Sequence, residues 1–259
     1  MRLVYLTVLV LVAACVPARA QSTNFSISDV QVAYGWSFNE PGILEHVPKS
    51  DITFENISGW SWGNSYLFVD VLRSWSEADA NAKEVYAEFY PSMSLGKVFG
   101  EGPSKTLIRD VGITLGLATG VRSTGPAPFV VLPGITIDLN VPRFRALSIG
   151  AYAYIARGRF EGHLTSCGST TFQVTPSWSL PFSVGNAVFS FDGFFDVIGK
   201  HGECAAQFLT QPALKLDLSR FWHKPGVLQA GARWVYWHGK YGIEGEQDNL
   251  VMPVVIWTF

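Results

Sequence analysis

Acidic and aromatic side chains alternate along several short segments of the 259-residue chain. Aromatic rings stack on flat, unsaturated molecules, and each base–ring contact contributes about 1 to 3 kcal/mol. Carboxylates and amides beside such rings can hydrogen-bond the hydroxyl and amine groups of the same molecule. The candidate residues are Tyr66, Phe68 and Asp70; Glu84, Tyr86, Glu88 and Tyr90; Asp192, Phe194 and Asp196; Lys215 and Asp217; and Gln229 and Arg233. They predict a site for a small, flat, polar solute, and a solvated or salt-bridged wall is the alternative.

These segments alternate polar and apolar side chains with a period of two, which is typical of β-strands. Val111, Ile113 and Leu115, for example, face away from Gly112 and Thr114. Turn residues separate the segments. Twelve strands are predicted, at 29–38, 51–59, 65–73, 83–94, 108–119, 129–140, 146–156, 171–182, 187–197, 208–218, 227–238 and 249–259. The fold class is therefore all-β, with one domain over residues 21–259.

Five of the predicted strands contain an interior proline, at Pro91, Pro133, Pro176, Pro212 and Pro253. Proline cannot donate a ladder hydrogen bond and is normally confined to edges, strand starts or bulges. We interpret these positions as bulges or ladder ends near the rims of a sheet.

The first 20 residues resemble a secretory signal peptide. Arg2 precedes an apolar stretch, and Ala18 and Ala20 form the small-residue pattern that signal peptidases cleave. Cleavage after Ala20 would start the mature chain at Gln21. Lipidation of Cys15 is an alternative, because the residues before it resemble a lipobox. A retained membrane helix would need about 20 apolar residues, more than the stretch contains.

The two faces of the strands predict a transmembrane barrel. One face is apolar, whereas the other consists largely of Gly, Ala, Ser, Thr and Gln, which suits a wet lumen better than the coat of a soluble protein. A barrel of about eight strands already has an interior that side chains just fill, so twelve strands predict a lumen. The apolar face then meets lipid, and the nine tryptophans form girdles at the two interfaces. Aromatic residues in an ordinary core are the alternative.

The final stretch, "NLVMPVVIWTF", fits this barrel. Val251, Pro253, Val255, Trp257 and Phe259 share one face of a strand. In a closed barrel the last strand pairs with the first, so a lipid-facing stripe can extend to the final residue. A terminal Phe after alternating apolar residues also resembles the end of bacterial outer-membrane barrels. These features predict a multi-pass β-barrel in the outer membrane of a Gram-negative bacterium.

Four segments in order resemble the nucleoside-specific channel-forming (Tsx-type) outer membrane family. They are "DITFENISGWSWGNSYLFVDV" (51–71), "YAEFYPSMSL" (86–95), "LSIGAYAYIAR" (147–157) and "FWHKPGVLQAGARWVYWHGKYG" (221–242). The resemblance spans essentially the mature chain. It implies a monomeric twelve-stranded barrel that lets nucleosides diffuse across the outer membrane, and some members serve as receptors for phages or colicins. No nucleoside contact is carried over residue by residue.

A general porin, a receptor barrel and an outer-membrane enzyme are the alternative functions. A general small-solute porin or a receptor barrel would have the same build, because a lumen of small polar residues fits any polar solute. An outer-membrane phospholipase would need Ser and His together on the lipid face. The histidines, His46, His163, His201, His223 and His238, fall in loops or at strand ends. We therefore expect no enzyme, no cofactor and no metal, and the net charge of −2 without a basic tract argues against nucleic acid as a partner.

Cys167 and Cys204 are the only cysteines left after signal-peptide removal. If the amino terminus starts in the periplasm, the seventh-to-eighth and ninth-to-tenth connections both lie outside the cell. These neighbouring connections carry the two cysteines, and the oxidising periplasm favours a bond between them. We predict a Cys167–Cys204 disulfide over the mouth of the barrel, with two free thiols as the alternative.

Overall fold

The computed structural model describes residues 24–123, 128–157, 167 and 170–259, and the predicted signal peptide lies outside these residues. Its strands are β1 (Phe25–Phe38), β2 (Val47–Gly59), β3 (Gly63–Ser74), β4 (Lys83–Ser94), β5 (Ile108–Arg122), β6 (Phe129–Leu139), β7 (Ala146–Ala156), β8 (Thr170–Val184), β9 (Ala187–Ile198), β10 (Gln207–Thr210), β11 (Ala213–Asp217), β12 (Leu228–His238) and β13 (Gln247–Thr258). The helical pieces are α2 (Leu95–Val98), η1 (Ser219–Trp222) and η2 (Lys240–Gly242). No helix in the described ranges is long and apolar enough to span a bilayer.

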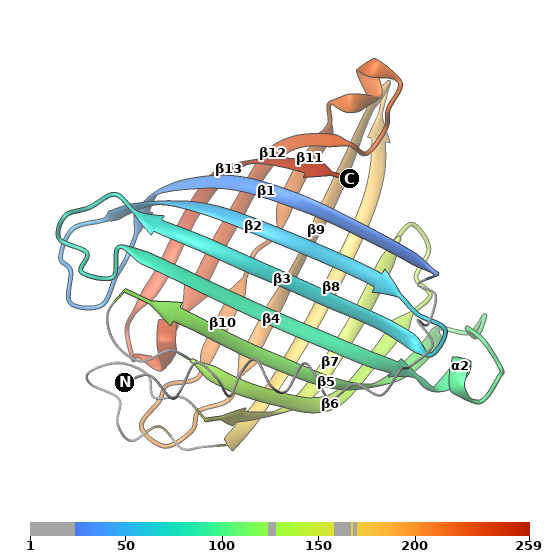
Figure 1. Cartoon of the computed structure of the whole chain (residues 1–259), viewed down its shortest axis with the longest axis horizontal. Helices are drawn as coiled ribbons and strands as arrows, with labels where there is room; N and C mark the ends of the chain where they lie inside the picture. The colour runs from blue at the N-terminus through green and yellow to red at the C-terminus, as the bar shows by residue number, and fades with distance from the viewer. Residues whose placement is uncertain (1–23, 124–127, 158–166, 168–169) are drawn as a thin grey trace, which may run out of the picture.

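The strands form one closed antiparallel barrel (Figure 1). Neighbours in sequence pair with each other, and β13 closes the ring by pairing with both β12 and β1. β10 and β11 keep a single register against β9 and against β12, so they are one strand interrupted at Gln211–Pro212. The barrel therefore has twelve strand positions, as predicted. β1 and β2 each begin four residues earlier than the alternation indicated.

Apolar side chains cover the outside of the barrel. Ile113 is 50% exposed, whereas its neighbour Thr114 is 3% exposed and lies inside. In β13, Val255 and Trp257 are exposed and Met252 is buried. The predicted assignment of the two faces is thus confirmed for these strands. The inner face of β13 is apolar as well, which the expectation of a polar lumen did not anticipate.

The interior prolines interrupt ladders without shifting them. Pro91, Pro133 and Pro176 each fall in a two-residue gap in the pairing with the next strand, and the pairs on both sides keep one register. Pro212 interrupts its strand in the same way, and Pro253 lies just beyond the last pair of β13 with β1. Proline lacks an N–H, so it omits a ladder bond but adds no residue. The bulge interpretation is therefore wrong for the first four prolines, and Pro253 marks the end of a ladder.

The alternation in β1 fails at its end. Phe38 is buried inside the barrel, although it has the parity of the exposed Val32 and Trp36. The register between β1 and β2 shifts between Gly35 and Phe38, which turns the ring inward. A Cβ at Gly35 would lie 2.6 Å from that ring, so only glycine leaves room for it.

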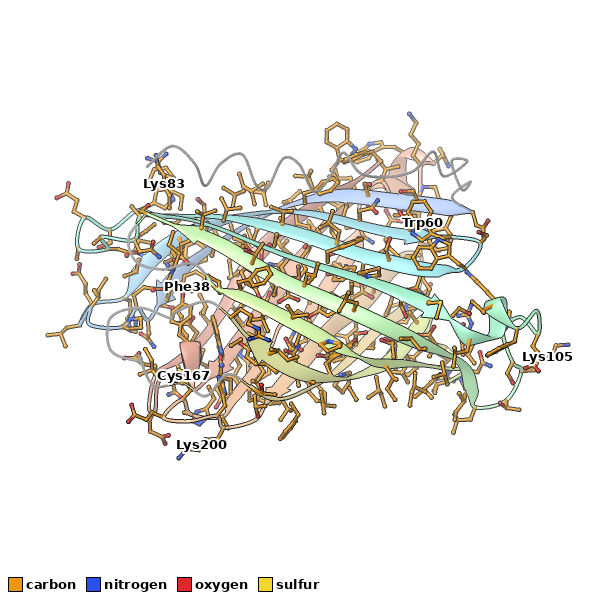
Figure 2. The ribbon with its side chains drawn as sticks, turned by 60° about the horizontal axis from the view of Figure 1, so that its bottom comes forward. Phe38, Trp60, Lys83, Lys105, Cys167 and Lys200 are labelled. Carbon is orange, nitrogen blue, oxygen red and sulfur yellow. A yellow bond between two sulfur atoms is a disulfide. The ribbon has the colours of Figure 1, made fainter. Side chains whose placement is uncertain are left out.

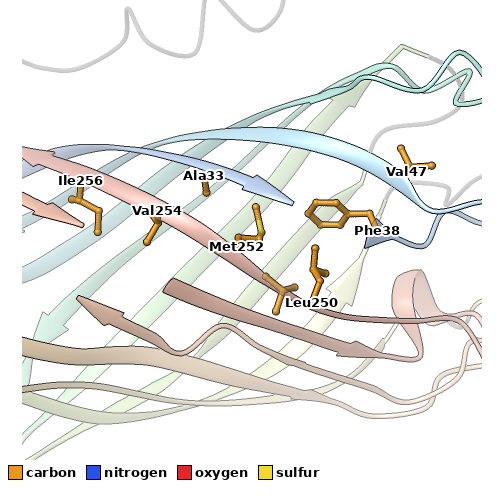
Figure 3. Close-up of a cluster of buried hydrophobic side chains, with 8 residues drawn as sticks. Ala33, Phe38, Val47, Leu250, Met252, Val254 and Ile256 are labelled. Carbon is orange, nitrogen blue, oxygen red and sulfur yellow. The ribbon is translucent and has the colours of Figure 1, made fainter. Parts of the chain in front are cut away.

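Phe38 belongs to a buried apolar cluster on the β1, β12 and β13 side of the interior (Figure 3). Its members are Ala33, Phe38, Val47, Val235, Leu250, Met252, Val254 and Ile256. Part of the barrel interior is therefore a packed core.

Candidate functional site

An acidic and aromatic surface lies on the inner face of β3 and β4. The Phe68 ring centroid is 5.9 Å from that of Tyr66 and 5.9 Å from that of Tyr86. The Tyr86 hydroxyl donates to Glu88 over 2.5 Å, and the Thr53 hydroxyl donates to Asp70 over 2.6 Å. The structure thus brings together five of the residues named from the sequence. Rings that could stack on a flat solute stand beside carboxylates that accept hydrogen bonds.

A hydrogen-bonded polar network continues this surface on β1, β2 and β12. Arg233 donates to Asp51 over 3.2 Å and to the side-chain oxygen Oε1 of Gln31 over 2.5 Å. The Gln31 amide donates to Glu55 over 3.0 Å and to Asp29 over 3.1 Å. Sequence reasoning named Arg233 but missed the other four members of the network, of which Asp51 and Gln31 contact Arg233 directly. Their parity, opposite to the outward Val30 and Val32, was the signal that could have found them.

Three further candidate residues, Lys215, Asp192 and Asp196, contact side chains on neighbouring strands. Lys215 and Asp192 form an ion pair of 2.6 Å between β11 and β9. Asp196 accepts hydrogen bonds from Thr175 over 2.5 Å and from Gln173 over 3.2 Å. Asp192, Asp196 and Lys215 thus lie on the inner face of β9 and β11, as predicted from their parity.

Two other candidate residues, Phe194 and Asp217, make contacts outside this polar network. Phe194 stands opposite Ser177 in the pairing of β8 with β9, and the Thr210 hydroxyl donates to its carbonyl over 2.7 Å. Asp217 is committed to the turn before β12, because it accepts from the Ser219 hydroxyl and the Gly226 amide, both over 2.8 Å. Asp217 therefore holds this turn.

Tyrosines fill the part of the interior between β4 and β7. The rings of Tyr90 and Tyr152 lie 5.7 Å apart, although β5 and β6 separate their strands. The Tyr90 ring occupies the space that a side chain at Gly116 would take, 2.5 Å from an ideal Cβ there. Small residues on one strand thus make room for large rings from another.

Charged side chains close one end of the barrel, which we call the capped mouth. It carries loops 39–46, 75–82, 199–206 and 239–246, and Figure 2 places Phe38, Lys83, Cys167 and Lys200 at this end and Trp60 and Lys105 at the other.

Two buried lysines organise the capped mouth, each only 2% exposed. Lys49 contacts Glu40 at 2.8 Å and Glu84 at 3.1 Å. Lys240 contacts Glu40 at 2.8 Å and Asp248 at 2.9 Å. Glu84, named above as a lining residue, therefore belongs to this charge cluster. Buried charges of this kind persist only when they are paired, so the cluster fixes the loops that contribute to it.

Loop 239–246 reaches across the capped mouth. It connects β12 to β13, yet the Tyr241 ring lies 4.7 Å from the guanidinium of Arg122 at the end of β5, on the opposite wall. Arg122 also contacts Glu84 over 3.2 Å, and Tyr241 packs edge-on against Trp237 with ring centroids 4.8 Å apart. Tyr241 adopts a left-handed backbone with φ of 58°. The loop is thus held over the opening by contacts at both walls.

The charge pairs set the ionisation of the loop residues. Burial opposes the charged form of Glu40, but the Lys240 and Lys49 ammonium groups outweigh it and hold the pKa of Glu40 below its ordinary value. Burial likewise opposes the charged form of Lys240, and Glu40 and Asp248 outweigh it and raise the pKa of Lys240. Burial raises the pKa of Tyr241 well above its ordinary value, so it is a neutral phenol. Glu40 and Lys240 are therefore both ionised at neutral pH.

The predicted disulfide is present. Cys167 is bonded to Cys204, and their Cα atoms are 5.0 Å apart. The bridge ties residue 167, between β7 and β8, to the loop between β9 and β10, as the strand count indicated. The Ala205 amide then donates to the Gly242 carbonyl over 2.8 Å. This contact joins the disulfide-bonded loop to loop 239–246 across the capped mouth.

Comparison with known proteins adds little at the level of sequence. No family model and no curated protein matches the chain. Similar solved structures include the KdgM porin (10% identity, TM-score 0.46, covering 91% of this chain and 99% of that one) and the NanC porin (12%, 0.46, 89% and 97%). Another is the translocator domain of autotransporter NalP from Neisseria meningitidis (13%, 0.44, 93% and 90%). Similarity at this level says nothing about a solute, and the nucleoside-channel resemblance stays a prediction.

The class of protein follows from the barrel itself. The sheet closes on itself, so the described strands leave no edge with unpaired backbone groups. Its outer face is apolar and exposed. Such a barrel is stable only where hydrocarbon covers that face, and closed barrels of this kind span outer membranes. The chain is an outer-membrane β-barrel protein of a Gram-negative bacterium.

Proposed function

We propose that the barrel is a passive channel for small, uncharged polar solutes, with nucleosides as the preferred cargo. The observation that carries the proposal is the surface on β3 and β4, where the Tyr66, Phe68 and Tyr86 rings stand beside Asp70 and Glu88. A nucleoside offers a flat face to such rings and ribose hydroxyls to such carboxylates. The general small-solute channel is the coarser form of the proposal, and the nucleoside preference is the finer one.

The same surface favours weak, reversible contact. A conducting site must bind a solute well enough to admit it and weakly enough to release it. Asp70 and Glu88 already accept hydrogen bonds from Thr53 and Tyr86, so a solute would compete with internal partners. The carboxylates also disfavour anions.

Liposome swelling tests the proposal. Proteoliposomes containing the purified barrel should swell faster in adenosine than in maltose or amino acids. Phe68→Ala should reduce the adenosine rate about fivefold or more, since one stacking contact is worth about 1 to 3 kcal/mol, and should leave the maltose rate unchanged or higher. Val71→Ala is the matched control, because Val71 is on the same strand and exposed on the outer face.

The outcomes separate the two forms of the proposal. Equal rates for adenosine and maltose, unchanged by Phe68→Ala, would leave a general small-solute channel. No swelling in any solute would refute the channel itself. Export is part of the same proposal: cleavage after Ala20 should deliver residues 21–259 to the outer membrane.

A further inference from the structure

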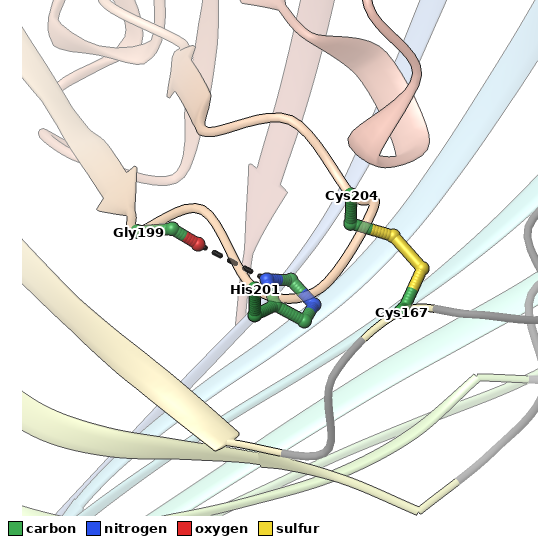
Figure 4. The surroundings of a disulfide bond; sticks show 4 residues. All are labelled: Cys167, Gly199, His201 and Cys204. Carbon is green, nitrogen blue, oxygen red and sulfur yellow. Dashed lines mark hydrogen bonds between the residues drawn. A yellow bond between two sulfur atoms is a disulfide. The ribbon is translucent and has the colours of Figure 1, made fainter.

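A buried histidine, His201, lies beside the Cys167–Cys204 disulfide. His201 is 5% exposed and Cys204 is 1% exposed. The Nδ1 atom of His201 lies 3.0 Å from the Gly199 carbonyl oxygen, and its Nε2 atom is buried and has no hydrogen-bond partner among the residues that the structure describes. Figure 4 shows this second nitrogen on the side of the ring that faces the sulfurs of Cys167 and Cys204. A buried ring nitrogen without a partner needs an explanation.

The contact with Gly199 fixes the form of the imidazole. A carbonyl oxygen only accepts, so Nδ1 carries a proton, and in the neutral ring with that proton Nε2 presents its lone pair. Histidines that bind metals typically donate their other ring N–H to a carbonyl or carboxylate in the same way. The ring of Tyr154, 5.5 Å from that of His201, packs against it and limits its rotation. His201 is thus oriented as a ligand would be.

The three side chains are close enough to share one ion. A ring nitrogen of His201 and the two sulfur atoms all lie within 4.8 Å of one another. Tetrahedral zinc binds sulfur at about 2.3 Å and nitrogen at about 2.0 Å, which separates its ligand atoms by roughly 3.3 to 3.9 Å. We propose that Cys167, Cys204 and His201 form a metal site for zinc or a similar thiophilic ion when the disulfide is reduced. The disulfide and the bound ion are then alternative states of one cluster.

A thiol reductant converts the disulfide to the metal-binding form. A dithiol breaks the S–S bond by supplying two electrons and two protons, and becomes a disulfide itself. Zinc then displaces both thiol protons to solvent and binds the two thiolates and Nε2. Three protein ligands leave the fourth tetrahedral position open to water. In the reverse direction, exchange with a small-molecule disulfide, which takes the two electrons and becomes two thiols, restores the Cys167–Cys204 bond, removes two ligands and releases the ion.

The site adjoins the loop over the capped mouth. An ideal Cβ at Gly242 would lie 3.0 Å from the Cys204 sulfur, so loop 239–246 touches the cluster directly. Gly242 has φ of 77°, which also favours glycine. Exchange between disulfide and metal therefore takes place in contact with this loop.

Zinc binding to the untagged, full-length mature barrel in detergent tests the proposal. The protein is reduced with dithiothreitol, freed of it without oxygen and titrated with Zn²⁺ against a chromophoric chelator, and Co²⁺ serves as a spectroscopic substitute. We expect one Zn²⁺ per reduced barrel, sulfur-to-cobalt charge-transfer bands, and binding at least about tenfold weaker in the oxidised barrel. His201→Ala should weaken binding to the reduced form by about tenfold or more. His238→Ala, at the exposed end of β12, is the matched control.

A second measurement needs no variant. Zn²⁺ should protect both thiols of the reduced wild-type barrel from alkylation by iodoacetamide, as mass spectrometry of the digested protein would show. Equal Zn²⁺ affinity of the reduced and oxidised barrels, or unprotected thiols at saturating Zn²⁺, would overturn the proposal. So would His201→Ala that folds and binds as tightly as the wild type.

Discussion

Replacing Lys240 by methionine should open the capped mouth. The Lys240 ammonium contacts Glu40 at 2.8 Å, Asp248 at 2.9 Å and the Asn39 carbonyl oxygen at 2.6 Å. It is the link between loop 239–246 and the neighbouring loop 39–46. Methionine has a similar length and fills the apolar space beside Phe38, but it supplies no charge and no donor.

The size of the effect follows from what each partner keeps. Removing one member of a buried ion pair costs about 3 to 5 kcal/mol. Glu40 retains Lys49 at 2.8 Å, and Asp248 retains the Asn39 amide at 2.7 Å, so the lower value applies. About 3 kcal/mol is roughly two orders of magnitude in an equilibrium constant. The ammonium also lies 5.8 Å from the ring centroids of Phe38 and Trp237. Methionine keeps apolar contact with both rings, so this free energy is lost mainly from the closed loop.

Single-channel recording in planar bilayers measures the result. Lys240→Met should show a larger or longer-lived open level than the wild type at neutral pH. Lys200→Met is the control, because Lys200 is exposed at the same end. Heat-modifiable migration on gels should show that all three barrels fold. If Lys240→Met conducts exactly as the wild type and Lys200→Met do, the loop is not held across the mouth by this lysine.

The remaining predictions concern the wall, the pH range and the amino terminus. Ile113→Arg should destabilise the barrel by about 2 to 4 kcal/mol in urea-dependent refolding into vesicles, whereas Ile113→Leu should not, and equal midpoints would contradict the outward position of Ile113. The pKa of Glu40 is lowered, so its stabilisation of the closed mouth is complete above the ordinary value of 4.5 and is lost as the pH falls through the lowered value. The pKa of Lys240 is raised, so its stabilisation is complete below the ordinary value of 10.5 and is lost only as the pH rises through the raised value. The occupancy of the closed level should therefore stay constant between these two ordinary values, and a change in that occupancy near pH 7 would count against the ion-pair account. Intact mass should place the mature start at Gln21, and an acylated Cys15 would rule that out.

Alternation in the sequence was sufficient to predict the barrel, because a strand with one face in lipid must place apolar residues at every second position. It was also sufficient for Tyr66, Phe68 and Asp70, which share a face of β3. It failed at Phe38, where a local register shift changes the face of one side chain without leaving a signal in the pattern.

The capped mouth was beyond prediction for a different reason. Lys49 and Lys240 are far apart in sequence and meet through Glu40, which sits in a loop. Loop conformations depend on contacts between distant segments, and nothing periodic marks them. Two cysteines could be paired by counting strands, but the approach of His201 to that pair depends on the path of a single loop.

Three of the prolines divide part of the barrel wall into hairpins separated by gaps in the hydrogen-bonded pairing. β3 pairs with β4, β5 with β6 and β7 with β8 across each proline without a break, whereas the junctions from β4 to β5, β6 to β7 and β8 to β9 each have a gap of two residues. From β3 to β9, gaps at every second junction leave hairpins that are paired across the proline and joined along weaker seams. Such a wall bends at the seams before any hairpin separates, so its cross-section can change from round to oval while the barrel stays closed. Amide hydrogens bordering the seams should then exchange with solvent deuterium sooner than those inside the hairpins.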